Sequence, residues 1–337
     1  MAAKDSYQHF AQMADPLHLA LRHQLEHRRE ILAGAAAKTQ GEQVLSLLRE
    51  VDAALSRLEG GTYGICAMCH ESVEDERLIA NPLVRFCLDH LGPGEQEALE
   101  RDLELAAQIQ TRLLPKRDFR CDGWQVAYHY KPVGVVSGDY CDLVNGTDEQ
   151  LYFMVGDVAG KGVAASMLMS NLSAIFRALI PMGLPLAELM ERANRIFTGS
   201  TLPTQFATLI CGRGMRGGAL ELCSAGHVPA LVVTPEEVYR VDSHGLPIGL
   251  FDEQKFTTFS FEVPQGSSLV LFSDGVSEAR IEDDQEYGYE RIAESVQRCA
   301  KLKAGEIVAE CVRDLDSFLG SAQLFDDQTL MVVQKSI

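Results

Sequence analysis

The sequence predicts an α+β sandwich that is preceded by a helical hairpin, a small cysteine-bearing module and a linker helix. Leucines recur at helical intervals before residue 60, cysteine pairs follow between residues 60 and 92, and short β-type runs begin after residue 123. Helices interrupt these runs in two blocks, which favours a sandwich over a strictly alternating parallel sheet. We place the domain boundaries at 1–60 (hairpin), 61–93 (cysteine module), 94–115 (linker helix) and 116–337 (sandwich).

Composition restricts the classes of partner. The chain has 337 residues, of which 46% are hydrophobic, and 30 Lys and Arg against 48 Asp and Glu give a formal net charge of −18. This net negative charge argues against general electrostatic binding to nucleic acid or anionic lipid. We see no apolar run close to the ~20 residues that span a bilayer, and "MAAKDSYQHF" lacks the apolar core of a signal peptide. We therefore expect a soluble, cytoplasmic protein without a membrane or direct nucleic-acid partner.

The first helical segment predicts two antiparallel helices between Pro16 and Gly60, broken near "KTQGE". Each helix carries one apolar stripe, and a hairpin lets the two stripes bury each other. The stripe positions are Leu17, Leu21, Leu25 and Leu32, followed by Leu45, Leu48, Val51, Leu55 and Leu58.

A further helix is predicted from Glu95 to Leu114, between the boundary signal "GPGE" and Pro115. Its stripe follows steps of four and three residues: Leu99, Leu103, Ala106, Gln110 and Leu113. This pattern is typical of a helix packed on its neighbouring domain and equally of a parallel coiled-coil seam. We expect a homodimer formed through the N-terminal and linker helices.

Short strands are predicted throughout the remainder of the chain, with helical stretches at Val163–Leu179, Pro185–Phe197 and Tyr289–Leu319. The strand runs are "WQVAYHYKPV", "LYFMVGDV", "ATLICGRG", "ALELCSAG", "ALVVTP", "KFTTFSFEV", "SLVLFSDG" and "QTLMVVQKS".

Two ligand pairs between residues 66 and 90 predict a zinc site. Cys66 and Cys69 form a C-x2-C pair, and after seventeen residues Cys87 and His90 form C-x2-H. Each two-residue spacer lets two ligands take adjacent corners of one tetrahedron. Four protein ligands leave no open coordination position, so one structural Zn²⁺ is expected. The nine cysteines are otherwise unevenly spaced, which favours reduced thiols over a disulfide framework.

The segment "ALSRLEGGTYGICAMCHESVEDERLIANPLVRFCLDH" resembles the DksA/TraR zinc finger family. That family is associated with RNA polymerase through acidic residues at the tip of a helical hairpin, whereas the tip "AGAAAKTQGEQ" has no such aspartates. The resemblance thus implies the fold and the zinc ion. RNA polymerase binding, with the sandwich as an inactive scaffold, is the alternative function.

Acidic residues stand at the ends of four apolar runs in the sandwich. They occur in "VSGDYCD" (Asp139, Asp142), "FMVGDVAGKG" (Asp157), "LFSDGVSEA" (Asp274) and "LFDDQTLMVV" (Asp326, Asp327). Carboxylates gathered from separate strand ends make the all-oxygen site that Mg²⁺ or Mn²⁺ prefers. A pair of such ions activates water and polarises a phosphoryl group, so no nucleophilic side chain is needed.

Residues from about Glu100 to Val333 resemble the metal-dependent Ser/Thr protein phosphatases of the PPM superfamily, in its SpoIIE/RsbU branch. The matching pieces follow the family's order: "ELAAQIQTRLLP", "VSGDYCDL", "VGDVAGKGVAASMLM", "FATLICG", "CSAGHVPALVV", "GLPIGL", "LVLFSDGVSEAR" and "FDDQTLMVV". The resemblance implies an αββα sandwich that removes phosphate from Ser or Thr of a bacterial regulatory protein, such as an anti-sigma-factor antagonist. A small phosphorylated metabolite is the other substrate class.

The resemblance also implies roles for individual residues. Asp157 would bridge two Mn²⁺ or Mg²⁺ ions, the carbonyl of Val158 would bind one of them, and a bridging water would attack phosphorus. Asp139 would help to hold that second ion, and Asp274 and Asp326 would complete the first. The residues alone allow Asp326 or Asp327, and Asp142 matches a family acid without an assigned role. The family's Gly-Gly-Asp is Ser137-Gly138-Asp139 here, and its Tyr-Thr-Asp-Gly is Phe272-Ser273-Asp274-Gly275.

Overall fold

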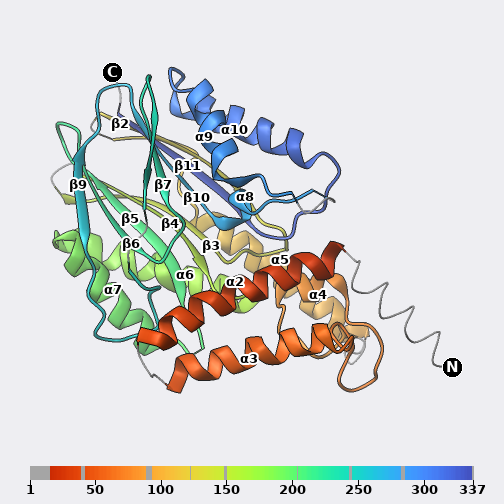
Figure 1. The fold of residues 1–337 in the computed structure, drawn as a ribbon. Helices are drawn as coiled ribbons and strands as arrows, with labels where there is room; N and C mark the ends of the chain where they lie inside the picture. Colours follow the sequence, from red (N-terminus) through yellow and green to blue (C-terminus); the bar gives the residue numbers. More distant parts are fainter. Residues whose placement is uncertain are drawn as a thin grey trace.

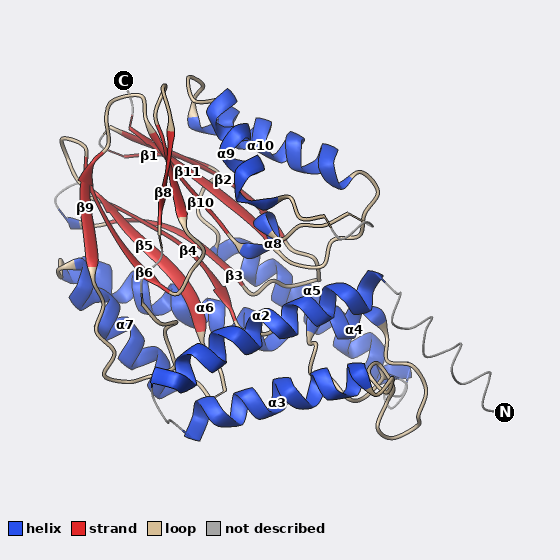
Figure 2. Ribbon diagram, in the orientation of Figure 1, coloured by secondary structure: helices blue, strands red, loops and turns tan. Residues whose placement is uncertain are grey.

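Two antiparallel sheets packed face to face form the centre of the protein, and helices cover both outer faces (Figure 1). The computed structural model describes residues 16–38, 42–88, 93–121, 123–147, 150–202, 204–242, 245–281 and 285–335. Within these ranges the predicted αββα sandwich is confirmed, with strands in the middle and helices outside (Figure 2).

The first sheet has six strands in the order β1-β2-β11-β10-β7-β8. Its central strands β10 and β11 are apolar on both faces, because one face meets the second sheet and the other meets helices. The strands are β1 (Asp118–Cys121), β2 (Trp124–Lys131), β7 (Ala230–Val233), β8 (Val238–Val241), β10 (Ser268–Phe272) and β11 (Gln328–Lys335).

The second sheet has five strands in the order β3-β4-β5-β6-β9. Buried side chains from both sheets, including Phe153, Ile210, Leu271 and Met331, form one core between them. The strands are β3 (Asp139–Asn145), β4 (Leu151–Val158), β5 (Ala207–Gly214), β6 (Ala219–Ala225) and β9 (Thr258–Glu262). Each predicted strand run contains an observed strand, β3 was indicated only by the acidic end "VSGDYCD", and β1 and β8 were not predicted.

The outer helices pack through their apolar faces. Helices α6 (Gly162–Leu179) and α7 (Leu186–Ser200) cover the second sheet. Helices α9 (Gly288–Arg298) and α10 (Ala304–Leu319) cover the first. The predicted helix over Tyr289–Leu319 is therefore two helices. A one-turn helix, α8 (Asp274–Ser277), follows β10 directly.

One of these helices corrects the expectation that no segment is apolar enough to cross a membrane. Gly162–Met182, comprising α6 and the short helix η3 (Ile180–Met182), meets that test by length and composition. However, 56% of its most apolar window is buried inside the protein. Residues such as Leu172 and Phe176 pack against the second sheet, so this segment is a core helix of the sandwich.

The N-terminal hairpin forms as predicted, from α2 (Pro16–Lys38) and α3 (Glu42–Glu59). The buried stripe of α3 differs from the predicted one. Leu45 is 41% exposed and Leu48 and Leu55 are half-buried, because the face against α2 is made by Val44, Leu47, Val51, Ala54 and Leu58. The prediction of Val51 and Leu58 is confirmed, whereas at the other three positions the buried residue is the one that precedes the predicted leucine, a choice that only packing makes.

The hairpin does not stand apart from the sandwich. Its buried leucines share one apolar cluster with Tyr63 and Leu78 of the cysteine module and with Phe206 and Leu250 of the sandwich. Helix α2 therefore runs across the ends of both sheets (Figure 1).

The linker helix α5 (Pro93–Leu113) packs on α6 of its own chain. The predicted stripe is half-buried at Leu99, Leu103 and Ala106, and Gln110 is buried. The side-chain amide of Gln110 donates to Ser137 O (2.7 Å) and accepts from Ser137 N (3.0 Å). On the opposite side Leu105 and Ile109 are 55% and 53% exposed.

Candidate active site

Two of the predicted acids are adjacent across a strand pair. Asp139 opens β3 and lies opposite Asp157 of β4 in the antiparallel register, and Val158 is the last residue of β4. A side chain on Gly138 would place its Cβ 3.3 Å from the carbonyl oxygens of Val158 and Gly160. Gly138 therefore permits the close backbone approach at this end of the sheet.

Asp274 reaches the same place from the other sheet. It follows β10 by two residues and begins α8, so its carboxylate lies at the strand end. The next residue, Gly275, touches the backbone, because an added Cβ would lie 2.0 Å from Asp327 O. This contact explains why a strand that ends in Asp is followed by Gly.

The adjacent acids before β11 have different surroundings. Asp327 is 7% exposed, and its carboxylate accepts hydrogen bonds from Val133 N (2.8 Å), Ser137 Oγ (2.8 Å) and Gly138 N (2.9 Å). Asp326 instead faces a cavity that Asp157 and Asp274 also line. Asp327 thus holds the loop before β3 in place through hydrogen bonds, whereas Asp326 lines the cavity.

Hydroxyl groups hold the Asp139 carboxylate in position. Its Oδ2 accepts hydrogen bonds from Ser273 Oγ (2.9 Å) and from Thr329 Oγ1, and its backbone N–H donates to Ser137 Oγ (3.0 Å). Ser137 and Ser273 are the two departures from the family pattern, and both contribute hydroxyls to this network. They retain the placement of the acids.

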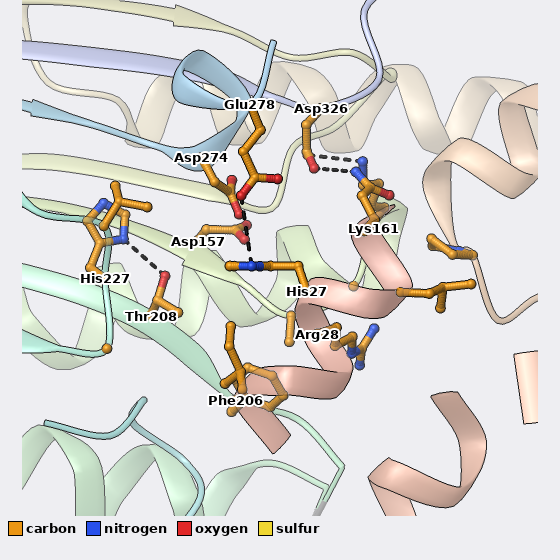
Figure 3. A pocket seen from close by; sticks show the side chains of 18 residues that line it. His27, Arg28, Asp157, Lys161, Phe206, Thr208, His227, Asp274, Glu278 and Asp326 are labelled. Carbon is orange, nitrogen blue, oxygen red and sulfur yellow. Dashed lines mark hydrogen bonds and ion pairs between the residues drawn. The ribbon is translucent and has the colours of Figure 1, made fainter. Parts of the chain in front are cut away.

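The cavity has a volume of about 100 Å³ and lies between the strand ends and helix α2. Figure 3 shows Asp157, Asp274, Glu278 and Asp326 on one side and His27 reaching toward them from α2. Lys161 Nζ lies 3.0 Å from Asp326 Oδ1 and donates to Phe325 O (2.5 Å). The amide of Gln24, also on α2, donates to Asp326 Oδ2.

Buried negative charge dominates this site. Burial and the neighbouring acids raise the pKa of Asp139 and of Asp157 well above the usual range of a carboxyl. Burial, Asp326 and Glu278 raise the pKa of Asp274 to about 7. Several carboxylates cannot remain ionised together in a buried site without cations, so the donor set fits hard divalent ions.

His227 lines the cavity without a free ring nitrogen. Nδ1 pairs with Thr208 Oγ1 (3.0 Å), and Nε2 lies 3.1 Å from Phe272 O, which requires a proton on Nε2. Burial lowers the pKa of His227 to about 4. The ring is therefore neutral, and it joins the two sheets through hydrogen bonds.

Several residues of the cavity were not predicted from the sequence. Glu278 stands four residues after Asp274, so helical spacing could have indicated it. Nothing in the sequence signalled that α2 would contribute Gln24, His27 and Arg28, because the approach of α2 depends on the hairpin's packing against Phe206.

Asp142 lies away from the cavity and is fully buried. Arg177 of α6 binds both of its oxygens, with Nε to Oδ2 at 2.8 Å and Nη2 to Oδ1 at 2.9 Å. The same Nη2 donates to Leu113 O at the end of α5 (2.7 Å). Asp142 therefore joins β3, α6 and α5, which gives this acid a structural role.

The cysteine module brings three predicted zinc ligands together. The sulfur atoms of Cys66, Cys69 and Cys87 lie within 4.8 Å of one another, and those of Cys69 and Cys87 are 3.4 Å apart. Burial acts to raise the pKa of Cys66, but backbone hydrogen bonds outweigh it and lower the pKa to about 6. Thiolates so placed suit Zn²⁺. The fourth predicted ligand, His90, lies outside the described residues.

Family models match both parts of the chain. Residues 147–336 match Stage II sporulation protein E (SpoIIE), and residues 61–89 match the prokaryotic dksA/traR C4-type zinc finger.

Individual relatives agree with the phosphatase match. The phosphoserine phosphatase RsbU of Bacillus subtilis is 26% identical over 254 residues, which cover 72% of this chain and 73% of RsbU. The solved RsbU and RsbW domains of Rv1364c from Mycobacterium tuberculosis are 26% identical, with a TM-score of 0.56, over 66% of this chain and 62% of that one. The SiaA-PP2C domain of Pseudomonas aeruginosa shares the fold, with a TM-score of 0.61 at 21% identity over 71% of this chain and 97% of that one.

Proposed function

The chain belongs to the SpoIIE family of PP2C-type Ser/Thr protein phosphatases, and we propose that it dephosphorylates a regulatory phosphoprotein in the bacterial cytoplasm. The observation that carries this proposal is the meeting of Asp157, Asp274 and Asp326 from three separate strand ends around one cavity. Asp139 stands directly beside Asp157 in the sheet.

We propose that these acids hold two Mn²⁺ or Mg²⁺ ions. Asp157 would contact both ions, Val158 O and Asp139 would serve one, and Asp274 and Asp326 would serve the other. When bound, such ions supply an activated water and polarise the phosphoryl group. The raised pKa values of Asp139, Asp157 and Asp274 support this assignment, because nearby cations would favour the ionised carboxylates.

Other side chains would position these groups. Ser273 and Thr329 fix the Asp139 carboxylate, and Asp327 fixes the loop that precedes β3. The side chain of Lys161 is 13% exposed beside Asp326. Its ammonium group lowers the free-energy cost of placing several carboxylates close together.

The test is release of phosphate from an aryl phosphate, with and without Mn²⁺. We expect Asp157→Asn and Asp274→Asn each to reduce turnover by roughly 100-fold or more, because each removes an anionic metal ligand. Asp252→Asn, at an exposed acid that does not line the cavity, is the matched control. Equal rates in the parent and both site variants would refute the proposed site.

The proposed substrate is a phosphorylated regulatory protein such as an anti-sigma-factor antagonist. RsbU, which this chain resembles over 72% of its length, is named a phosphoserine phosphatase. The ions would contact only the phosphate, so the remainder of the substrate must be recognised by surfaces around the cavity. The hairpin and zinc finger, held together by Zn²⁺ on Cys66, Cys69, Cys87 and His90, would provide the sensory or docking part.

We further propose a homodimer through α5. Leu105 and Ile109 lie one turn apart on its exposed side, while its other side packs on α6. Ile109→Glu should shift the chain toward monomer in sedimentation, because a charge would be buried in the dimer contact. Thr111→Glu, at an exposed polar position of the same helix, is the control. An unchanged oligomeric state and unchanged turnover for Ile109→Glu would contradict this proposal.

A further inference from the structure

Helix α2 brings a histidine to the candidate active site from outside the phosphatase fold. His27 lines the cavity with Gln24 and Arg28 of the same helix, opposite Asp157 and Asp274. In Figure 3 the imidazole of His27 points from α2 into the cavity, toward the carboxylates. The predicted phosphatase motifs lie beyond residue 100, so this side chain is an addition of this chain's N-terminal hairpin.

The imidazole meets two acids that share one face of a helical turn. Asp274 and Glu278 are four residues apart around α8, which turns both carboxylates to the same side. One ligand atom from each of His27, Asp274 and Glu278 lies within 4.8 Å of the other two. His27 Nδ1 and Glu278 Oε1 are 3.9 Å apart, which is too long for a hydrogen bond. Ligands at about 2.1 Å from a shared ion lie about 3 to 4 Å from each other.

A second contact keeps α2 at this position. Gln24, one turn before His27, donates through Nε2 to Asp326 Oδ2 and to Phe325 O (3.3 Å). Its Oε1 is buried and accepts no hydrogen bond from the described residues. A cation in the cavity, or a water bound to that cation, would satisfy such an acceptor.

The donor set distinguishes between metals. Mg²⁺ prefers oxygen ligands in a strict octahedron and keeps several waters, whereas an imidazole with two carboxylates suits a transition-metal ion. We propose that His27, Asp274 and Glu278 bind a divalent transition-metal ion, here Mn²⁺, which fastens α2 over the active site. This proposal rests on the proposed function in one respect, because it shares Asp274 with the catalytic pair of ions.

Fastening α2 would regulate access to the site. The helix lines both the cavity of about 100 Å³ and a second one of about 40 Å³, and the two share Gln24, Asp274, Glu278 and Asp326. On this proposal, a phosphorylated polypeptide would displace α2 to bring its phosphate between the acids. The ion would therefore stabilise the closed arrangement, and the hairpin and zinc finger would be the parts that a signal moves.

Pulsed electron paramagnetic resonance of the zinc-loaded full chain with Mn²⁺ tests the proposed ligand directly. We expect nitrogen coupling from a bound imidazole in the parent, its loss in His27→Gln, and its retention in His23→Gln, a histidine one turn earlier on the same helix. Absence of coupling in the parent, or its persistence in His27→Gln, would overturn the proposal.

Hydrogen exchange along residues 16–38 tests the fastening. At Mn²⁺ about ten times its Kd, exchange in the parent should be about tenfold slower than with Mg²⁺, and His27→Gln should abolish this difference. Faster exchange with Mn²⁺ would show that metal and helix compete, which would overturn the proposal. Aryl phosphate hydrolysis separates the two hypotheses: intact nitrogen coupling in the parent, with no hydrolysis by the parent or by His27→Gln, in which α2 is no longer held by the ion, would refute only the phosphatase site.

Discussion

The role of an individual side chain in the candidate site depends more on its surroundings than on its residue type. Asp326 and Asp327 are adjacent and chemically identical, yet one lines the cavity and the other accepts three hydrogen bonds from the loop 133–138. The pleat of an extended chain separates them, because successive side chains point to opposite sides. The same effect turns the side chain of buried Asp142 to the opposite face of β3 from that of Asp139, although the two are only three residues apart.

The acid cluster predicts that metal affinity depends on pH. Since Asp274 has a pKa of about 7 in the folded chain, a metal ion must displace a proton from it below that pH. Apparent Mn²⁺ affinity should rise by roughly tenfold per pH unit for each displaced proton up to about pH 7. Calorimetric titration at pH 5.5, 6.5 and 7.5 measures this slope.

The metal-free protein should show the opposite trend in stability. The folded chain holds this proton up to about pH 7, whereas the unfolded chain releases it near pH 3.8, so unfolding becomes easier as pH rises between those values. Asp274→Asn removes this titrating group. It should therefore reduce the pH dependence of both the Mn²⁺ affinity and the free energy of unfolding. A flat affinity profile in the parent would argue against a protonated acid cluster.

Helix α6 connects the linker helix to the strand that carries Asp139. Its Arg177 binds the buried Asp142 of β3 and the last carbonyl of α5, while its first turn follows Lys161 at the cavity. These contacts form a continuous path from α5 to the site. They give α6 a role beyond covering the second sheet.

The ion pair between Arg177 and Asp142 is expected to stabilise this junction. Arg177→Ala should lower the free energy of unfolding by about 2–3 kcal/mol, because it leaves a buried carboxylate without its charged partner. The double variant Arg177→Ala, Asp142→Ala should lose less free energy of unfolding than the two single variants lose together. Urea denaturation of the four proteins gives the coupling energy.

A matched control lies on another helix. Arg192→Ala removes an exposed ion pair with Glu188, and such pairs contribute about 0–1 kcal/mol. If Arg192→Ala and Arg177→Ala lowered the free energy of unfolding by similar amounts, the burial of Asp142 would add nothing to the strength of its ion pair with Arg177.

At the scale of the whole molecule, one apolar cluster joins the hairpin, the zinc finger and the sandwich. Tyr63 and Leu78 of the zinc finger, Leu25 of α2, and Phe206 and Leu250 of the sandwich all belong to it. The integrity of the zinc finger and the position of α2 over the cavity are therefore linked through packing.

Loss of zinc should loosen the hairpin from the sandwich. Cys66→Ser and Cys87→Ser should each reduce bound zinc from about one ion per chain toward none, because each removes a predicted ligand. They should also speed proteolysis within residues 16–60, because the hairpin leucines lose their packing against the zinc finger residues of the cluster. Metal analysis and limited proteolysis measure the two effects.

A cysteine outside the zinc finger provides the control. Cys121→Ser changes a half-buried thiol at the end of β1 and should leave zinc content unchanged. Full zinc content in Cys66→Ser, or unchanged cleavage of the hairpin after complete zinc loss, would contradict the corresponding part of this prediction.

The sequence by itself determined the α+β sandwich, the hairpin, the grouping of Cys66, Cys69 and Cys87, and the acids at the strand ends. These features are local: apolar periodicity, ligand spacing, and an Asp next to a Gly that must lie against another backbone. Tertiary structure alone decided the buried stripe of α3, the partner of Asp142, the difference between Asp326 and Asp327, and the arrival of His27 at the cavity. The reason is that these depend on contacts between segments far apart in the chain, where burial and packing choose among positions that are equivalent in sequence.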